Sequence, residues 1–396
     1  MLFTLGPAVP RLPEKILIDE IEAMAARWQT SAGQPPIHIS HWNPSDEFLR
    51  SLHALVTPAS LFDPLRCFQT YDPMPYRYSR GLPAIASVLR KLGFSSEDAS
   101  ALITENGTTS ISTVANWLKL HGVAEVTLLS PAYFTTAHSL RRLGIAVREV
   151  ALERGADGTY RLPAGLDVQP GDALWLTNPI YSTGHYALEQ SCDLLRQIAD
   201  AGTFVVADES LALRATAIAQ KLGGHKNFVG IYTPHKSICM NGMKFSAVVT
   251  HAHHQATLED WGDVLSGGLS LSATIAVQHF ISASFDEYRS AFAQLLHQTR
   301  EWHIDLVRGF DGTVALDHCS EGHFIMAYLP RLAAELRHRI DFVEEILAAT
   351  GCILIPGFRS GFDERSGFCF RINLARDSGA FRDAVERLYS FLHARA

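Results

Sequence analysis

The segment Thr233-Pro-His-Lys-Ser-Ile-Cys-Met-Asn-Gly-Met-Lys244 lies between two apolar runs of strand length, residues 228–232 and 245–249. This pattern predicts a turn between two strands. A buried lysine must be paired or give up its proton, because an unpaired ammonium is costly to bury. A lysine with a lowered pKa is a nucleophile toward carbonyl groups. Lys236 is therefore a candidate catalytic residue, with a solvated or ion-paired lysine as the ordinary alternative.

Upstream of this segment, short apolar runs alternate with stretches of helical periodicity. In one helical stretch, apolar residues stand at 188, 192, 195 and 199, spaced by four, three and four. Such alternation predicts a mostly parallel sheet with helices on both faces, and ligands bind beyond the carboxyl ends of its strands. The expected strands are 125–129, 147–152, 172–177 and 203–207, and unusual residues follow several strand ends: 106–109, Tyr133, 178–184, Asp208 and Lys236.

The pattern divides the chain into three parts. Residues 1–49 are expected to form an N-terminal arm with a helix over 12–31, which packs with a small domain. Residues 50–285 are expected to form the large domain. After about residue 285, long helical stretches flank short strands, so residues 286–396 are expected to form a smaller α+β domain.

Composition excludes several classes of protein. The chain has 396 residues, of which 47% are hydrophobic and 19% charged, a balance typical of globular proteins. A net charge of −7 and the absence of a basic run argue against a nucleic-acid partner. No apolar run reaches the roughly 18 residues that a membrane helix needs. The N-terminus lacks the basic flank of a secretory signal, so a cytoplasmic location is expected.

The cysteine and histidine patterns predict no metal or redox site. The six cysteines are dispersed and form no C-x-x-C pair, which favours reduced thiols. His251, His253 and His254 have no acidic or cysteine partner at ligand spacing.

Three further features suggest a binding site. Asn106-Gly-Thr-Thr109, at an expected strand-to-helix turn, offers backbone N–H groups to an anion, although an ordinary helix cap has the same composition. Asp208 ends an apolar strand, where a carboxylate caps a neighbour or pairs with a cation. Arg371 interrupts the apolar strand 368–374 and needs a carboxylate partner, either a substrate or a structural salt bridge.

These motifs, together with Tyr76-Arg-Tyr-Ser-Arg-Gly-Leu-Pro83 and Ser130-Pro-Ala-Tyr133, resemble those of the aspartate aminotransferase-like family of fold-type I enzymes. The resemblance runs in order from about residue 40 to the C-terminus. It implies an α/β fold in which a mostly parallel, seven-stranded sheet lies between helices, beside a smaller α+β domain. It also implies pyridoxal 5′-phosphate (PLP) as cofactor and a homodimer with active sites at the interface.

The resemblance implies a role for each matching residue. Lys236 would form the Schiff base with PLP, Asp208 would pair with the pyridinium nitrogen, and Arg371 would bind the substrate carboxylate. Tyr133 would stack on the ring. The cofactor phosphate would be held by a larger set: Asn106, Gly107, Thr108, Thr233, Lys244 in place of the usual arginine, and Tyr76 from the neighbouring subunit.

The sequence departs from the family pattern around the ring oxygen. Tyr181 stands where the family has an asparagine, and Leu211 stands where it has a tyrosine. We hypothesise that the Tyr181 hydroxyl replaces one of the two hydrogen bonds to that oxygen; Asn178 could instead reach the ring if the loop is rebuilt. His235, beside the lysine, is a second acid–base candidate, a histidine on the phosphate side of the cofactor, or a solvated histidine.

The substrate pocket is expected near Trp42, Tyr78 and residues 266–272. Trp42 stands where a glycine is usual, so it either narrows the substrate pocket or belongs to the core.

The leading functional prediction is transfer of an amino group between an L-amino acid and a 2-oxo acid. The main alternative is another PLP reaction on the same fold, such as elimination, replacement, cyclisation or oxidation in a specialised biosynthetic pathway. A PLP-sensing regulatory domain is disfavoured, since such domains follow a DNA-binding module and the charge does not suit one.

Overall fold

The computed structural model describes residues 13–41, 43–55, 85–94, 98–155, 158–238, 240, 242–266, 269–310, 312–317, 321–332, 340–357, 361–362 and 367–396. Trp42, Tyr76 and Tyr78 lie outside these residues, so the roles expected for them stay predictions.

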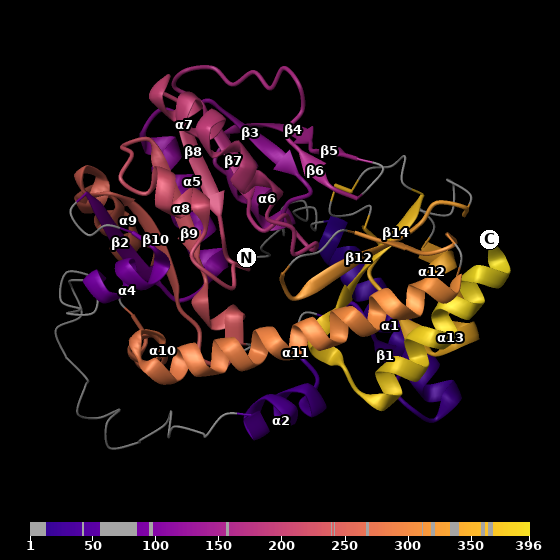
Figure 1. Cartoon of the computed structure of the whole chain (residues 1–396). Coiled ribbons are helices and arrows are strands. Elements are labelled where there is room, and N and C mark those ends of the chain that lie inside the picture. The colour runs from indigo at the N-terminus through magenta and orange to yellow at the C-terminus, as the bar shows by residue number, and fades with distance from the viewer. Residues whose placement is uncertain are drawn as a thin grey trace, which may run out of the picture.

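A seven-stranded sheet forms the centre of the large domain (Figure 1). Its order is β2-β10-β9-β8-β7-β3-β4, and only β10 runs antiparallel to its neighbours. The predicted α/β fold with a mostly parallel sheet is thereby confirmed. The strands are β2 (Ala99–Thr104), β3 (Glu125–Ser130), β4 (Ala146–Ala151), β7 (Ala173–Thr177), β8 (Phe204–Asp208), β9 (Phe228–Tyr232) and β10 (Ser246–His251).

The middle strands are buried on both faces, which explains their continuous apolar sequences. In β8, Val205 and Ala207 belong to one core, whereas Val206 belongs to the other. One face is covered by α5 (Gly107–Leu120), α6 (Phe134–Arg142) and α9 (Gln255–Ser266). The opposite face is covered by α4 (Ile85–Leu92), α7 (Cys192–Asp200), α8 (Ala217–Leu222) and α10 (Leu271–Ile281).

The small domain joins the C-terminal third of the chain to its N-terminal arm. Its three-stranded sheet has the order β11-β12-β14, formed by Ala315–Leu316, Phe324–Leu329 and Phe368–Asn373. Helices α12 (Ile340–Thr350) and α13 (Gly379–Arg395) pack against each other. Strand β1 (Ile37–His38) pairs with β13 (Cys352–Ile353), and α1 (Pro13–Ala32) packs Ile21 and Met24 against Leu347.

The long helix α11 (Ala283–Val307) runs beneath both domains (Figure 1). The boundary expected between residues 285 and 286 therefore falls inside a continuous helix. Helix α2 (Asp46–Leu55) packs against α11, because Phe48 places its ring edge-on to Phe292 with centroids 5.6 Å apart.

A hairpin of the large domain, β5 (Glu153–Arg154) and β6 (Tyr160–Arg161), reaches the small domain. Arg154 forms an ion pair with buried Asp317 at 2.8 Å, and its guanidinium lies 3.8 Å from the centre of the Tyr328 ring. The Tyr160 hydroxyl donates to Asp317 Oδ2 at 2.8 Å. Burial raises the pKa of Asp317 to about 6, against the opposing effect of Arg154. We call these four residues the interdomain network.

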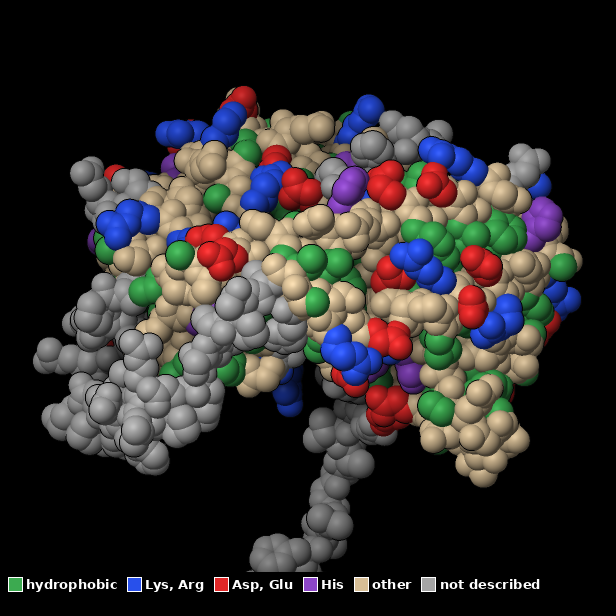
Figure 2. Space-filling model, turned by 60° about the horizontal axis from the view of Figure 1, so that its bottom comes forward, with side chains coloured by type: hydrophobic (Ala, Val, Ile, Leu, Met, Phe, Trp, Pro, Cys, Tyr) green, Lys and Arg blue, Asp and Glu red, His purple; other side chains and the backbone are tan. Residues whose placement is uncertain are grey.

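Charges of both signs are interspersed on the face shown in Figure 2. Among the described residues, no helix combines the length and apolar character needed to cross a membrane. Within the same part of the chain, no three His, Cys, Asp or Glu side chains gather as metal ligands would. Cys192, Cys352 and Cys369 are buried and form no disulfide with one another.

Candidate active site

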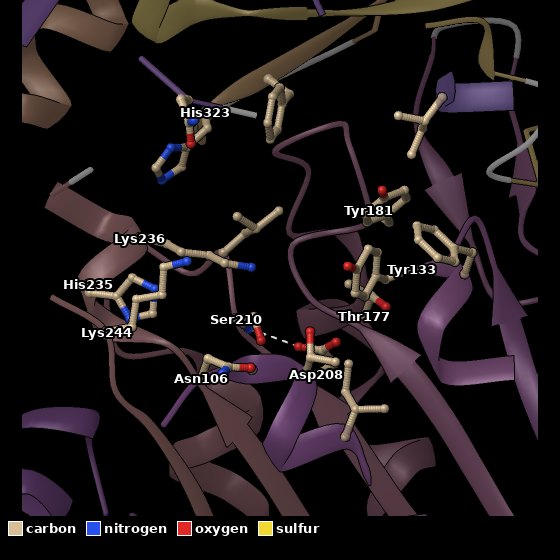
Figure 3. Close-up of a pocket in the computed structure, with 18 residues that line it drawn as sticks. Asn106, Tyr133, Thr177, Tyr181, Asp208, Ser210, His235, Lys236, Lys244 and His323 are labelled. Atoms are coloured by element: carbon tan, nitrogen blue, oxygen red, sulfur yellow. Dashed lines mark hydrogen bonds between the residues drawn. The ribbon is translucent and has the colours of Figure 1, made fainter. Parts of the chain in front are cut away.

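A cavity of about 370 Å³ opens beyond the carboxyl ends of β7 and β8, between the two domains (Figure 3). This is the edge where parallel sheets bind their ligands. The large domain contributes most of its wall and the small domain contributes His323 and Phe324. The lining residues are Ile18, Asn43, Asn106, Gly107, Thr108, Ile111, Tyr133, Phe134, Thr177, Tyr181, Asp208, Ser210, Leu211, His235, Lys236, Lys244, His323 and Phe324.

The N-terminus of α5 forms one wall. Asn106 Oδ1 accepts a hydrogen bond from the Thr109 N–H at 3.1 Å, so Asn106 caps the helix. Gly107 and Thr108 line the cavity in the first turn, where backbone N–H groups and the helix dipole favour an anion. A Cβ atom on Gly107 would lie only 3.0 Å from Thr233 Oγ1, so a larger residue here would require the Thr233 side chain to shift by a few tenths of an ångström.

Buried hydroxyl groups support this turn from behind. The Thr233 hydroxyl donates to Ser210 Oγ at 3.0 Å and lies 3.3 Å from Ser246 Oγ. The Ser110 hydroxyl donates to Ser246 Oγ at 2.8 Å, which ties the first turn of α5 to β10. Thr233 is not among the residues that line the cavity, and the contact with the cofactor phosphate expected from the sequence stays a prediction.

Asp208 lies at the floor of the cavity and is only 3% exposed. Its Oδ1 accepts the backbone N–H of Ser210 at 3.1 Å (Figure 3). Burial raises the pKa of Asp208, while Ser210 and the positive charge of Lys236 oppose the rise. A carboxylate so placed is stabilised by a cationic ligand group, because Ser210 and Lys236 offset its burial only in part.

Lys236 belongs to a short 3-10 helix, Pro234–Ile238, that follows β9. Figure 3 shows its side chain extending into the cavity, with Lys244 beside it. Burial lowers the pKa of Lys236; Asp208 opposes this effect, and Lys244 adds to it. The side chain therefore meets the requirement for a nucleophilic lysine, which must be neutral part of the time.

His235 lines the same wall as a neutral ring. Its Nδ1 lies 2.8 Å from the carbonyl oxygen of Phe245 and 3.2 Å from the Phe245 N–H, so the ring is anchored to the backbone of that residue. Burial, with smaller contributions from the charges of Lys236 and Lys244, lowers its pKa to about 3, against the opposing effect of the hydrogen bond with Phe245. His235 is therefore a buried, neutral residue, which contradicts the alternative of a solvated histidine.

Tyr181 and Tyr133 stand on the opposite side of the cavity, with ring centroids 5.9 Å apart. The Tyr181 hydroxyl is hydrogen-bonded to Arg371, and burial raises its pKa to about 12. Asn178 does not line the cavity, because its Nδ2 donates to Glu209 Oε1 at 2.8 Å behind the sheet edge. The structure thus brings Tyr181 to the cavity and leaves Asn178 outside it.

Arg371 is buried behind the cavity wall. Its Nε and Nη2 donate to the carbonyl oxygen of Ser40 at 3.0 and 2.9 Å, and its guanidinium lies 4.8 Å from the centre of the Phe324 ring. It is not a lining residue of the cavity, and it reaches the site through Tyr181. The expected direct carboxylate contact stays a prediction.

No family model and no curated protein matches the chain. Solved structures match over nearly its full length. A methionine aminotransferase from Escherichia coli superposes with a TM-score of 0.72 at 16% identity, over 97% of this chain and 100% of the other. A multiple substrate aminotransferase from Thermococcus profundus gives 0.75 at 12% identity, over 98% and 96%. The PLP-dependent cyclase OrfR gives 0.75 at 18% identity, over 99% and 100%.

The chain has the fold-type I, aspartate aminotransferase-like fold. At these identities the likeness establishes the fold alone. The fold that the resemblance in short motifs implied is therefore confirmed. The substrate and the reaction require evidence from the site itself.

Sequence reasoning missed several lining residues of this fold-type I cavity, His323 above all. His323 comes from the small domain, is 8% exposed and faces Lys236 in Figure 3. Its buried Nε2 has no hydrogen-bond partner among the described residues, and burial lowers its pKa to about 3. A histidine at the edge of the apolar run 324–329 was a usable signal. No sequence pattern marked three other lining residues, Asn43, Ser210 and Ile18.

Proposed function

We propose that this protein is a PLP-dependent aminotransferase that exchanges an amino group between an L-amino acid and a 2-oxo acid. The observation that supports the proposal most is the meeting of Lys236, Asp208 and the N-terminus of α5 in one cavity. PLP has a suitable partner group for each of them. Its aldehyde can react with the amine of Lys236, its ring nitrogen can pair with the carboxylate of Asp208, and its phosphate can bind at the helix N-terminus.

The residues present fit PLP as a resident cofactor. Asn106, Gly107 and Thr108 would hold its phosphate with Lys244, and Tyr133 would lie against its ring. Asp208 provides the strongest test of fit, because it is a buried carboxylate whose raised pKa indicates too little positive charge around it. When bound, PLP would supply an aldehyde that takes up amines and a ring that accepts electrons from the substrate Cα.

The chain itself supplies proton transfer and orientation. The Nζ of Lys236, with its lowered pKa, is suited to take a proton from the substrate Cα and to return it nearby. Asp208 keeps a proton on a facing ring nitrogen, because its charge would otherwise stay unpaired. Tyr181 links the cavity to Arg371, so that a substrate carboxylate could be held by the hydroxyl, the guanidinium or both.

A second candidate is a PLP reaction that does not end in transamination. Leu211 lines the cavity where the family has a tyrosine, so one hydrogen bond to the ring oxygen has no counterpart at that position. One of the similar structures is a PLP-dependent cyclase. Both observations leave cofactor binding unchanged. They bear instead on the electron distribution in the ring and on the product formed from the substrate.

Borohydride reduction followed by peptide mass spectrometry tests the cofactor. We expect PLP to be fixed on the peptide that contains Lys236 in the native protein, and nothing to be fixed in the Lys236→Ala variant. A visible absorbance band that disappears on addition of an L-amino acid alone, with pyridoxamine phosphate formed, supports the aminotransferase. Retention of the band with formation of product supports the second candidate.

We also propose a homodimer in the cytoplasm, with Tyr76 reaching the cofactor phosphate of its partner. This rests on the sequence resemblance, since Tyr76 lies outside the described residues. Light scattering combined with size exclusion gives the mass directly. Mixing Tyr76→Phe subunits with Lys236→Ala subunits tests whether Tyr76 acts across the interface. If it does, each mixed dimer has one site with both Tyr76 and Lys236 intact, and activity should return.

A further inference from the structure

A second cavity, of about 380 Å³, lies along α11 on the other side of the segment Glu321-Gly-His-Phe324. Its wall is rich in cations: Arg289, His297 and Arg300 come from α11, and Arg214 comes from the loop after β8. We call this cavity the α11 groove. Glu321 is its one acidic lining residue among those the structure describes.

Arg300 is the group in the groove that lacks a counter-charge. It is 5% exposed, and its one hydrogen bond in the described structure is from Nη2 to the carbonyl oxygen of Gly322 at 3.3 Å. Its Nε is buried without a partner. An arginine cannot shed its proton, so a buried guanidinium must be compensated by an anion or remain costly.

The other cations of the groove are already paired. The guanidinium of Arg214 binds Glu189 at 2.9 Å and Glu321 at 3.1 Å. Arg289 binds Asp286 at 2.9 Å, and His297 Nδ1 lies 3.8 Å from Glu301 Oε1. Glu321 therefore pairs with Arg214. The positive charge of Arg300 is not balanced by an ion pair within the groove.

His297 adds a second basic side chain beside Arg300, with its Nδ1 3.8 Å from Glu301 Oε1. It precedes Arg300 by three residues on α11, so the two side chains lie on one face of the helix. Arg289 lies eleven residues before Arg300, roughly 16 Å along the same helix, and marks the far end of the groove.

We propose that the α11 groove binds a small organic anion, with a phosphate or carboxylate group held by Arg300 and flanked by His297. The inference does not depend on the proposed function, because the groove is separate from the cavity that holds Lys236. The groove touches the active site through one segment, since Gly322 accepts the Arg300 hydrogen bond and the next residue, His323, lines the active-site cavity.

Calorimetric titration with inorganic phosphate, against chloride at matched ionic strength, tests the site. The turn at Asn106 is a second place where phosphate could bind, so two variants are compared. Arg300→Gln should raise the Kd of the groove site at least about tenfold, the value of one charge-assisted hydrogen bond. Lys244→Gln should leave that site unchanged. Unaltered phosphate binding in Arg300→Gln, or loss only in Lys244→Gln, overturns the proposal.

Stability provides an independent readout. In phosphate-free buffer, Arg300→Gln should melt at or above the Tm of the native protein, because an uncompensated buried charge has been removed. Added phosphate should then raise the Tm of the native protein and of the control Arg308→Gln, whose exposed guanidinium belongs to the residue that follows α11. Equal phosphate stabilisation of Arg300→Gln contradicts the proposal.

Crystals of the native protein soaked in selenate avoid any effect of substitution on folding. Density beside Arg300 supports the site, and density confined to the turn at Asn106 overturns it. Acetate in place of phosphate distinguishes the two chemical classes of ligand. If phosphate binds and acetate does not, the natural ligand is assigned as a phosphate ester. If acetate binds comparably, the natural ligand is assigned as a carboxylate.

Discussion

Replacing Asp208 by asparagine should affect the empty protein and its cofactor complex in opposite directions. The side chain is 3% exposed, and burial raises its pKa. A group whose folded pKa is raised contributes stability at low pH that is lost as the pH rises through that pKa. Asp208 therefore destabilises the empty protein at pH 8, and Asp208→Asn should raise its Tm by a few degrees there, with a smaller gain at pH 5.

The same substitution removes the charge that pairs with the cofactor ring. A hydrogen bond to a charged group contributes about 1.5–3 kcal/mol, so the Kd for PLP should rise roughly 10- to 150-fold. Fluorescence titration of the empty protein measures this Kd, and thermal melts at the two pH values measure the stability.

Glu209→Gln is the matched control. Glu209 is 1% exposed, and burial raises its pKa to about 7, but it accepts hydrogen bonds from Asn178 and Thr216 and does not line the cavity. It should change stability and leave the Kd for PLP unaltered. An unchanged Kd in Asp208→Asn, or equal losses of affinity in both variants, would refute the assignment of Asp208 to the ring nitrogen.

Three further substitutions test other parts of the site. Tyr181→Phe should raise the KM for the amino acid about tenfold, because Arg371 loses a buried hydrogen-bond partner; unchanged kinetics would exclude Tyr181 from carboxylate binding. His323→Phe should lower kcat/KM for the preferred substrate roughly tenfold and flatten its preference among amino acids, measured on a panel of them, if the free ring nitrogen binds a polar side chain. Gly322→Ala should cost about 2–4 kcal/mol in urea unfolding, because a Cβ would lie 2.6 Å from opposing backbone at a φ of +117°. Gly379→Ala, which meets open space, should cost nothing.

The sequence predicted the parts of the site that follow from the order of strands. Asp208 ends β8 and Lys236 follows β9, and these strands are neighbours, so both residues had to reach the same sheet edge. The place of Asn178 and Thr233 just behind the lining residues could not be predicted, because it depends on hydrogen bonds to Glu209 and Ser210.

Residues from the small domain escaped prediction for a different reason. His323 faces Lys236 only because two domains pack together, and no local periodicity encodes that contact. The Arg300 site has the same origin, since it combines a helix, a loop after β8 and the segment before β12.

The interdomain network has a consequence for how the protein melts. Domains joined only by a connecting helix can unfold one after the other, each with its own heat-absorption peak. Here, loss of the small domain would leave Arg154 and Tyr160 of the hairpin without Asp317. Because breaking a buried ion pair costs several kcal/mol, the two domains should melt as one unit. Scanning calorimetry of the native protein should show a single peak, and Asp317→Ala should split it.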